Sequence, residues 1–202
     1  MPRTESAAEI PELEPVPYNP EDRKSWKKGV GLAQAWRKKY DKIFDDKDLE
    51  LAQNRIAIHS ARYFFEWAAA IELFKKKGVL SLVTAYVHKT QKRKGEILTR
   101  LIPDPSKRDF LAGGRVRMLG ESFRIKRPDL LVYTRDLRRF CFVEVKGNQD
   151  PLKEKQRISF LEIRKRIGVE VYQLRLLPRN EVMRDPAVLS VSRQIPPLDA
   201  DS

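Results

Sequence analysis

Two apolar segments near the middle of the chain carry charged residues at regular positions: RPDLLVY at residues 127–133 and FVEVKG at residues 142–147. In an extended strand, Glu144 and Lys146 lie on one face, and the valines that alternate with them lie on the other. The proline before Asp129 disfavours helix at the preceding arginine and places Asp129 at the start of the first strand. If the two strands pair as a hairpin, Asp129 lies beside Glu144.

A pair of neighbouring carboxylates indicates a divalent metal ion. Like charges a few ångströms apart repel, and one carboxylate takes up a proton unless a cation lies between them. Oxygen ligands suit Mg²⁺ or Mn²⁺, and a water acidified by such an ion can attack a phosphodiester. Lys146 would then orient that water or hold a phosphate oxygen. The alternative is an ordinary glutamate–lysine pair on an exposed edge strand.

The segment after the second strand predicts a helix over residues 151–167 that ends at Gly168. One stripe of this helix faces the sheet, and its members are Gln156, Phe160, Ile163 and Ile167. A polar amide on an inner face needs a hydrogen-bond partner. We therefore expect Gln156 to lie near the two carboxylates or a bound phosphate. A glutamine that is merely satisfied within the core is the alternative.

A longer helix is expected over residues 49–77, ended by Gly78. It offers two candidates for a third acid at the metal. Glu72 has lysines three and four positions later, which is typical of a solvated helix face, whereas Glu66 is followed by alanines at those positions. Glu66 is therefore the preferred candidate.

The chain is strongly basic. Its 202 residues include 41 lysines and arginines against 28 aspartates and glutamates, which gives a formal net charge of +13 and a pI near 9.9. Such an excess favours a polyanionic partner, most often nucleic acid.

The composition also excludes several classes of protein. No stretch approaches the roughly 20 apolar residues of a membrane span, and the first residues lack the apolar core of a signal peptide. Cys141 is the only cysteine, so a disulfide scaffold is excluded, as is a zinc site built with the two histidines. No glycine-rich phosphate loop is present. We therefore expect a cytoplasmic protein that makes no membrane contact.

Composition divides the chain into four parts. Residues 1–21 are rich in proline and glutamate and are expected to form a disordered acidic leader. Folding of this leader onto a basic surface is the alternative. Residues 22–48 are expected to be a basic helical extension, residues 49–178 the main domain, and residues 179–202 a polar tail.

The basic extension carries Trp36 and Tyr40 four residues apart, which places them on one helix face. Two interpretations fit this spacing. The aromatic residues dock on the main domain, or they stack on the bases of a nucleic acid strand. Docking is the preferred interpretation, and it leaves the neighbouring lysines in water.

The order of the expected elements predicts an α/β domain with a sheet covered by helices. Besides the two helices, this prediction rests on five strands and a basic turn: strands at residues 79–87, 115–119, 129–134, 140–146 and 169–177, and the turn at residues 92–95.

Together, Pro128-Asp129 and Glu144-Val145-Lys146 resemble the signature of the PD-(D/E)XK nucleases. The run from Gly147 to Gln156 that follows, Gly-x-x-Asp-x-Leu-x-x-Lys-Gln, is similar to the VRR-NUC branch of that superfamily. The resemblance covers about residues 127–177, with a weaker match at the helix of Glu66.

The resemblance implies a restriction-endonuclease-like core, with a mixed sheet flanked by helices, and Mg²⁺- or Mn²⁺-dependent DNA cleavage. It implies that Asp129, Glu144 and Glu66 bind the metal, that Lys146 is the catalytic lysine, and that Gln156 is a further site residue. About 50 residues separate Gly78 from Asp129, more than a minimal core of this kind requires.

Basic residues near these motifs are candidates for contacts with the DNA backbone: Lys92, Arg93, Lys126, Arg127, Lys153 and Lys155. The function expected from the whole sequence is a metal-dependent DNA endonuclease that acts on duplex, branched or flapped DNA. RNA as a substrate and a homodimer both stay open. The alternatives are a non-catalytic nucleic-acid-binding or assembly module on the same fold, and a nuclease toxin or restriction-type effector.

Overall fold

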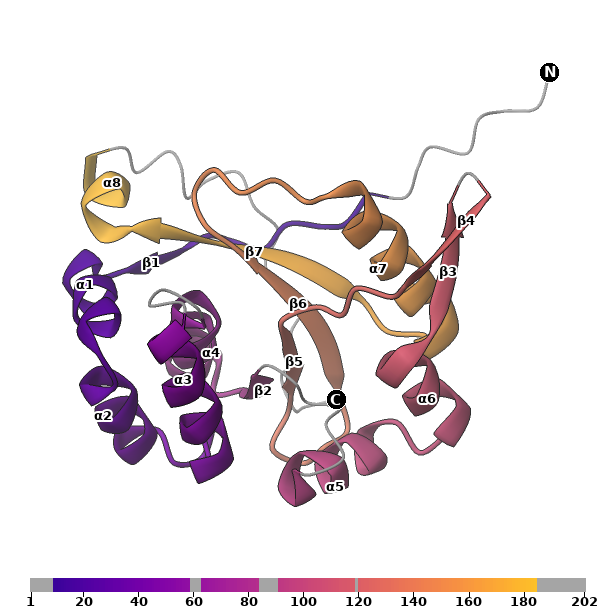
Figure 1. The fold of residues 1–202 in the computed structure, drawn as a ribbon, viewed down its shortest axis with the longest axis horizontal. Helices are drawn as coiled ribbons and strands as arrows, with labels where there is room; N and C mark the ends of the chain where they lie inside the picture. The colour runs from indigo at the N-terminus through magenta and orange to yellow at the C-terminus, as the bar shows by residue number, and fades with distance from the viewer. Residues whose placement is uncertain (1–8, 59–62, 84–90, 119, 185–202) are drawn as a thin grey trace.

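A five-stranded mixed sheet lies at the centre of the molecule (Figure 1). The computed structural model describes residues 9–58, 63–83, 91–118 and 120–184. The strands of the sheet are β1 (Val16–Tyr18), β2 (Leu80–Val83), β5 (Leu130–Tyr133), β6 (Phe140–Lys146) and β7 (Val171–Pro178). They follow the order β1-β7-β6-β5-β2, in which β1, β7 and β6 are parallel and β6, β5 and β2 are antiparallel.

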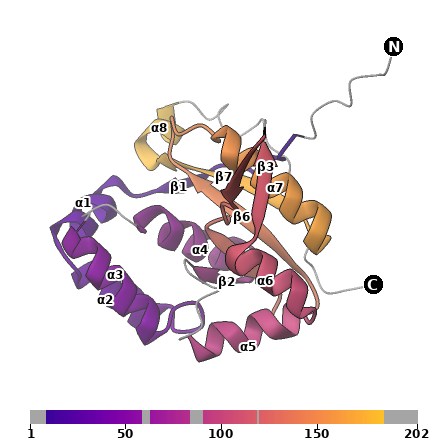
Figure 2. The ribbon, with the colours of Figure 1, turned by 45° about the vertical axis from the view of Figure 1, so that its right-hand side comes forward.

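The described residues also form helices and a separate two-stranded ribbon. The helices are α1 (Pro20–Lys28), α2 (Gly31–Lys39), α3 (Asp46–Ile58), α4 (Phe64–Lys77), α5 (Lys92–Leu101), α6 (Pro105–Gly113), α7 (Glu154–Ile167) and α8 (Arg179–Arg184). The ribbon pairs β3 (Arg115–Met118) with β4 (Glu121–Arg124). Figures 1 and 2 show α1–α4 on one side of the sheet, and α5–α7 with the ribbon on the other.

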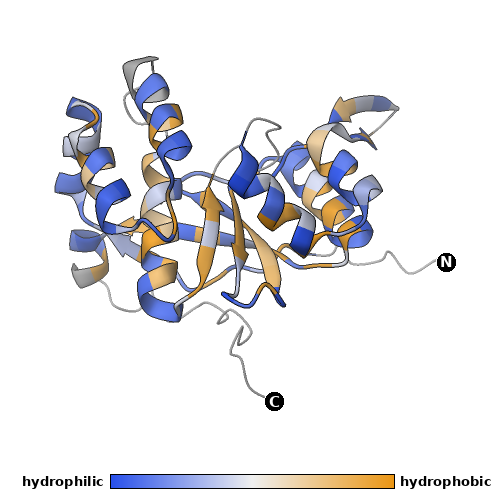
Figure 3. Ribbon diagram, turned by 90° about the horizontal axis from the view of Figure 1, so that it is seen from below, coloured by the Kyte–Doolittle hydropathy of each residue, from blue (hydrophilic) through white to orange (hydrophobic). Residues whose placement is uncertain are grey.

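Each face of the sheet buries its own hydrophobic cluster. Successive side chains of β6 point to opposite faces of the sheet and so enter different clusters. Val143 and Val145 belong to the cluster that lies under α4, whereas Phe142 belongs to the other cluster, with Phe160 of α7. Figure 3 shows the apolar character of the central strands and the mixed polar and apolar character of the helices around them. This alternation confirms the predicted faces of the second strand. It also places Glu144 and Lys146 on the side of α7.

The predicted hairpin is confirmed. In the antiparallel pair of β5 and β6, Leu130 lies opposite Val143 and Tyr133 lies opposite Phe140. The next pair in this register is Asp129 and Glu144. The helix after the hairpin ends at Gly168, which has the left-handed conformation expected of a C-cap glycine. The mixed sheet with helices on both faces is the predicted restriction-endonuclease-like fold.

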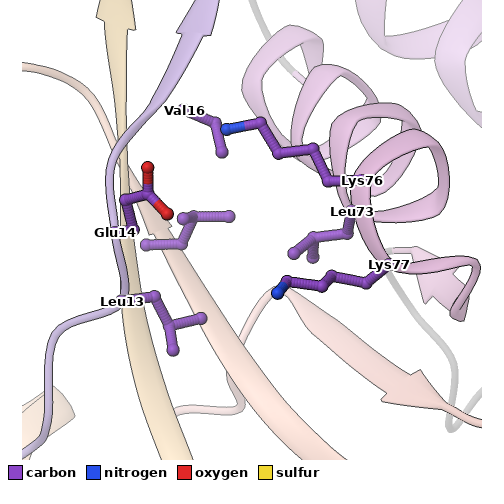
Figure 4. A pocket seen from close by; sticks show the side chains of 7 residues that line it. Leu13, Glu14, Val16, Leu73, Lys76 and Lys77 are labelled. Atoms are coloured by element: carbon purple, nitrogen blue, oxygen red, sulfur yellow. The ribbon is translucent and has the colours of Figure 1, made fainter. Parts of the chain in front are cut away.

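The prediction of a disordered leader is wrong for residues 10–21. Ile10, Leu13, Val16 and Tyr18 are buried, and β1 extends the sheet beside β7. Figure 4 shows Leu13 and Val16 facing Leu73 of α4 across a small cavity. Although prolines lack an N–H donor, they are compatible with an edge strand, and the segment buries its spaced apolar side chains. Residues 1–8 lie outside the described residues.

Four further expectations need correction. The helix predicted over residues 49–77 is two helices, because α3 starts at Asp46 and α4 starts after Tyr63, which has a φ of 68°. The boundary predicted between residues 48 and 49 therefore falls inside α3. The basic turn predicted at residues 92–95 is the first turn of α5. The start of the predicted tail forms α8.

The docking interpretation of the N-terminal aromatic residues is confirmed. Trp36 packs against Trp26 and Phe64, and the ring of Tyr40 lies edge-on to Phe74. Trp36 and Tyr40 are partly buried and pack against the hydrophobic cluster under α4, to which Trp26 of α1 belongs, so α1 and α2 share a core with α4. None of the helices in the described part of the chain is long and apolar enough to cross a membrane.

Candidate active site

Asp129 and Glu144 lie together at the open end of the β5–β6 hairpin, away from its turn. The backbone N–H of Val145 donates a hydrogen bond to Oδ2 of Asp129 at 2.9 Å, which fixes the aspartate against β6. Glu144 is buried, with 3% of its surface exposed, and Asp129 is partly buried. The predicted proximity of the two carboxylates is therefore observed, and the strand register produces it.

Lys146 is held by two side chains that were expected near it. Its Nζ lies 3.0 Å from Oε1 of Glu144 and donates a hydrogen bond to Oε1 of Gln156 at 3.1 Å. The amide of Gln156 donates in turn to Oε1 of Glu144 at 2.5 Å. Gln156 thus contacts both charged groups, as its place on the inner stripe of the helix predicts.

Gln156 also links the site to the start of α7. Its Oε1 accepts a hydrogen bond from the backbone N–H of Lys153 at 3.1 Å, as in the second half of a capping box. The N-terminus of α7 and the lysine on β6 therefore share one acceptor. This arrangement ties the position of Lys146 to that of the helix.

One oxygen of the carboxylate pair has no partner. Oε2 of Glu144 is buried and, with both carboxyl groups ionised, no group in the described part of the chain donates a hydrogen bond to it. Burial raises the pKa of Asp129 well above its usual value, and the nearby Glu144 and Glu66 raise it further. Burial also raises the pKa of Glu144, although Lys146 opposes this shift. Two neighbouring carboxylates, one buried and one partly buried, are unfavourable when both are ionised, and a cation between them removes the conflict.

These observations fit a divalent ion held by two carboxylates. The free oxygen of Glu144 and the carboxylate of Asp129 are hard oxygen ligands, which Mg²⁺ and Mn²⁺ prefer. Two protein ligands are enough for such an ion, because it keeps several of its waters. The described part of the chain has no group of three or more Asp, Glu, His or Cys side chains arranged to hold a metal. Asp129 and Glu144 are the two candidate ligands held together by the hairpin, and Glu66 stays a predicted third ligand, whose charge raises the pKa of Asp129.

Glu66 nevertheless lies in the same cavity. A cavity of about 750 Å³ is lined by Glu66, Asp129, Glu144 and Lys146 together with the loop that follows β6. Glu72, the other candidate, lies one turn and a half further along α4 and forms an ion pair with Lys75 at 2.7 Å. The structure therefore brings Glu66 toward the carboxylates and leaves Glu72 outside this cavity.

A second cavity of about 360 Å³ reaches the same carboxylates from another direction. Besides Asp129 and Glu144, its walls include Arg124, Lys126 and Arg127, which are all exposed. The two carboxylates thus lie where a basic cavity meets the larger one.

The remaining predicted contacts with DNA line neither of the two cavities. Lys153 and Lys155 are exposed at the start of α7, and the ammonium of Lys155 lies over the ring of Phe123. Lys92 and Arg93 line neither of the two cavities. Arg93 instead donates hydrogen bonds to the backbone carbonyls of residues 42 and 43, so its contacts hold α5 against the loop before α3.

Several residues of the site were not predicted. Ser159 is buried on the inner stripe of α7 and accepts a hydrogen bond from the N–H of Lys126 at 3.0 Å, which positions the basic loop. Its spacing of three from Gln156 is a signal that the sequence contains. Arg124 belongs to a strand that was not predicted. Arg23 and Phe65 line the larger cavity only because the chain folds back there, and no local pattern indicates that.

The mixed sheet with helices on both faces is a restriction-endonuclease-like fold, as in the PD-(D/E)XK nucleases. A comparison with models of protein families matches residues 67–175, more than half of the chain, to the VRR-NUC domain. The chain belongs to the VRR-NUC family, as its motif predicted. Comparisons with curated proteins and with solved structures found no match.

Membership in this family indicates a nuclease-type function with DNA as the substrate class. The matched range includes the hairpin with Asp129 and Glu144, and it includes Gln156. It starts one residue after Glu66, so β1 and α1–α3 lie outside it.

Proposed function

We propose that the chain is a divalent-metal-dependent endonuclease that hydrolyses phosphodiester bonds in DNA. The observation that supports this proposal best is the unpartnered Oε2 of Glu144 beside Asp129, with the ammonium of Lys146 3.0 Å from the other oxygen of Glu144. An exposed glutamate–lysine pair on an edge strand, the alternative interpretation, does not fit, because both side chains are buried in a central strand.

Asp129 and Glu144 would hold the ion, through Oε2 in the case of Glu144. When bound, Mg²⁺ or Mn²⁺ supplies Lewis acidity, which acidifies a water and stabilises negative charge on the phosphoryl oxygens. Gln156 donates a hydrogen bond to Oε1 of Glu144 and accepts one from the ammonium of Lys146, so it orients both groups. The ammonium of Lys146 keeps a remaining donor for the attacking water or for a phosphate oxygen.

Glu66 and the exposed cations have supporting roles in this proposal. Glu66 would be the third acid of the site, because it lines the same cavity and its charge raises the pKa of Asp129. Lys126 and Arg127 hold backbone phosphates on the basic side of the site. Because the two cavities differ in chemistry, the two sides of the scissile phosphate meet different surfaces. We therefore expect branched or flapped DNA to be preferred over uniform duplex.

The proposal is tested by incubating the purified chain with plasmid, blunt duplex, flapped and branched DNA in Mg²⁺, Mn²⁺ or EDTA. Cleavage is expected with either ion and not in EDTA. The decisive variant is Lys146→Met, which keeps an unbranched apolar stem but removes the ammonium. We expect it to lower the cleavage rate by about 10²-fold or more.

Lys165→Met is the matched control, because Lys165 is an exposed lysine near the other end of α7. It should cleave at the rate of the unsubstituted chain. If Lys146→Met and Lys165→Met are indistinguishable on every substrate and with both ions, the proposed active site is wrong. Glu144→Gln and Glu162→Gln form a second matched pair, because Glu162 is bound by Arg166 on α7, away from the hairpin.

Two expectations from the sequence stay predictions, a cytoplasmic location and the absence of membrane contact, and two questions stay open, a homodimer and RNA as a substrate. Sedimentation of the purified chain tests the homodimer. RNA versions of the same substrates test the last.

A further inference from the structure

The larger cavity has a second wall, formed by residues outside the range that matches the family. This wall is contributed by β1, α1 and the start of α4. Its side chains are Tyr18, Arg23, Tyr63 and Phe65. Three are aromatic and the fourth is a guanidinium, which is a combination typical of surfaces that stack on bases.

Arg23 and Phe65 form a stacked pair on this wall. The guanidinium carbon of Arg23 lies 4.8 Å from the centre of the Phe65 ring. Tyr18 meets the same ring edge-on, with ring centres 5.4 Å apart, and its hydroxyl accepts a hydrogen bond from Nη1 of Arg23 at 3.4 Å. Within the described part of the chain, Arg23 forms no salt bridge with a carboxylate. Ring packing therefore does most to hold the guanidinium in place.

This pair lies directly beside the proposed active site. The edge of the Phe65 ring approaches Gly147, so that a Cβ added to that glycine would be 3.5 Å from the ring. Gly147 follows Lys146, and Glu66 follows Phe65. A nucleotide next to the scissile phosphate would reach this wall.

The charge of the larger cavity does not suit a phosphate at this wall. Besides the carboxylate pair, Glu66, Asp150 and Glu181 line the cavity. Its cations are Arg23 and Lys146, and Lys146 is already within 3.6 Å of Asp150. Acidic side chains repel a phosphate, whereas a neutral base is not repelled. The basic cavity on the other side of the carboxylates has the opposite character.

We propose that Arg23 and Phe65 form a stacking subsite for an unpaired base of the DNA strand that crosses the carboxylate pair. This inference rests on the proposed function, because it assumes DNA at that site. It assigns the backbone to the basic cavity and a base to the larger one. The favoured substrate therefore carries unpaired nucleotides on one side of the scissile bond.

The test measures binding by fluorescence anisotropy with the full chain in EDTA, so the result does not depend on cleavage. Three probes are compared: a blunt duplex, the same duplex with a single-stranded tail, and the tailed duplex with abasic sites in the tail. Removing the bases leaves the phosphates in place. We expect the abasic tail to bind about tenfold more weakly than the intact tail. Equal affinities for the two tails would overturn the proposal without any variant.

Two substitutions of Arg23 separate stacking from charge. Arg23→Ala should bind the intact and the abasic tail equally, because the platform is lost. Arg23→Lys preserves the charge but lacks the guanidinium plane, so it should behave like Arg23→Ala. An Arg23→Lys chain that keeps the full difference between the two tails would show that the guanidinium plane does not stack on the base, and would overturn the subsite.

Lys27→Ala is the matched control, because Lys27 is an exposed cation on the same helix and does not line the cavity. It should retain the full difference between the two tails. The result of the cleavage assay with Lys146→Met does not depend on the result of this binding assay. A chain that does not cleave can still show base-dependent binding, and a nuclease can lack it.

Discussion

The carboxylates of Asp129 and Glu144 are adjacent because the register of the β5–β6 hairpin makes them adjacent. Their proximity destabilises the protein without a cation, since Glu144 is buried, Asp129 is partly buried, and their charges repel. The same feature that would bind an ion therefore has a measurable effect on folding.

Asp129→Asn is expected to stabilise the metal-free chain by about 1 kcal/mol, because a neutral amide replaces the carboxylate with the raised pKa. The amide oxygen can still accept the hydrogen bond from the N–H of Val145. Unfolding by urea in EDTA measures the difference. Mn²⁺ should then stabilise the unsubstituted chain, by about 2.7 kcal/mol at a concentration one hundred times its Kd, and should not stabilise the variant.

Asp109→Asn is the control for this prediction, because Asp109 is exposed on α6. It should leave both the stability in EDTA and the response to Mn²⁺ unchanged. If Mn²⁺ stabilises Asp129→Asn as much as the unsubstituted chain, Asp129 is not a ligand.

Gln156 is expected to act as a positioning residue. Gln156→Ala removes its contacts with Lys146 and Glu144, and we expect the cleavage rate to fall about 10- to 100-fold. Affinity for DNA in EDTA should not change, because the side chain contacts charged groups of the site rather than the substrate. Gln34→Ala on the exposed face of α2 is the matched control. A parallel loss of affinity would contradict the positioning role.

The residues that the sequence predicts best are those with a short-range periodic pattern. Glu144 and Lys146 follow from the period of two in a strand, and Gln156 follows from its place on a helical stripe. Arg23 and Phe65 are 42 positions apart in the sequence, and only the packing of α1 on α4 brings them together. Such pairs have no local signal, because their contact depends on the tertiary fold.

At the level of elements, β1 shows where composition misleads. Prolines and glutamates predict disorder over residues 1–21, but a few apolar side chains at suitable spacing are enough to add an edge strand. The first turn of α5 shows the reverse case. Its lysines suggest a solvated turn, yet Lys94 is completely buried, because a partner from another helix neutralises it. Neither the edge strand nor the burial of Lys94 can be predicted from the residues that are close in sequence.

The buried ion pair of Lys94 and Asp48 joins three elements, since Lys94 also donates a hydrogen bond to the carbonyl of Val83 at 2.6 Å. Asp48→Ala leaves a buried ammonium without its counter-charge, and we expect a loss of about 3–5 kcal/mol in the free energy of unfolding. Denaturation in urea measures it. The double variant Asp48→Leu, Lys94→Met should recover most of the loss, because no uncompensated charge remains.

The exposed pair of Lys47 and Glu50 on α3 provides the comparison. Glu50→Ala should have a small effect, because water solvates the lysine that remains. If Asp48→Ala and Glu50→Ala are equally mild, the pair does not support the packing of α5 on α3.

At the scale of the whole molecule, the net charge of +13 is unevenly placed around the site. Arg124, Lys126 and Arg127 gather at the basic cavity, whereas acidic side chains dominate the larger one. Since a uniform net charge attracts DNA without orienting it, the asymmetry is what would direct the backbone to one side of the carboxylates.

This placement predicts which cations set the dependence of DNA binding on salt. Replacing Arg124, Lys126 and Arg127 together by alanine should reduce the slope of log K against log salt concentration by up to about 2.7, since each lost phosphate contact contributes about 0.9. The matched variant replaces three exposed lysines of the N-terminal helices and the loop after them, Lys27, Lys38 and Lys42. Both variants lower the net charge by three, so an effect of total charge would change both slopes equally. We expect the slope to change only for the first variant, with blunt duplex titrated in EDTA over a range of salt concentrations. Equal slopes for the two variants would mean that the basic cavity does not hold the backbone.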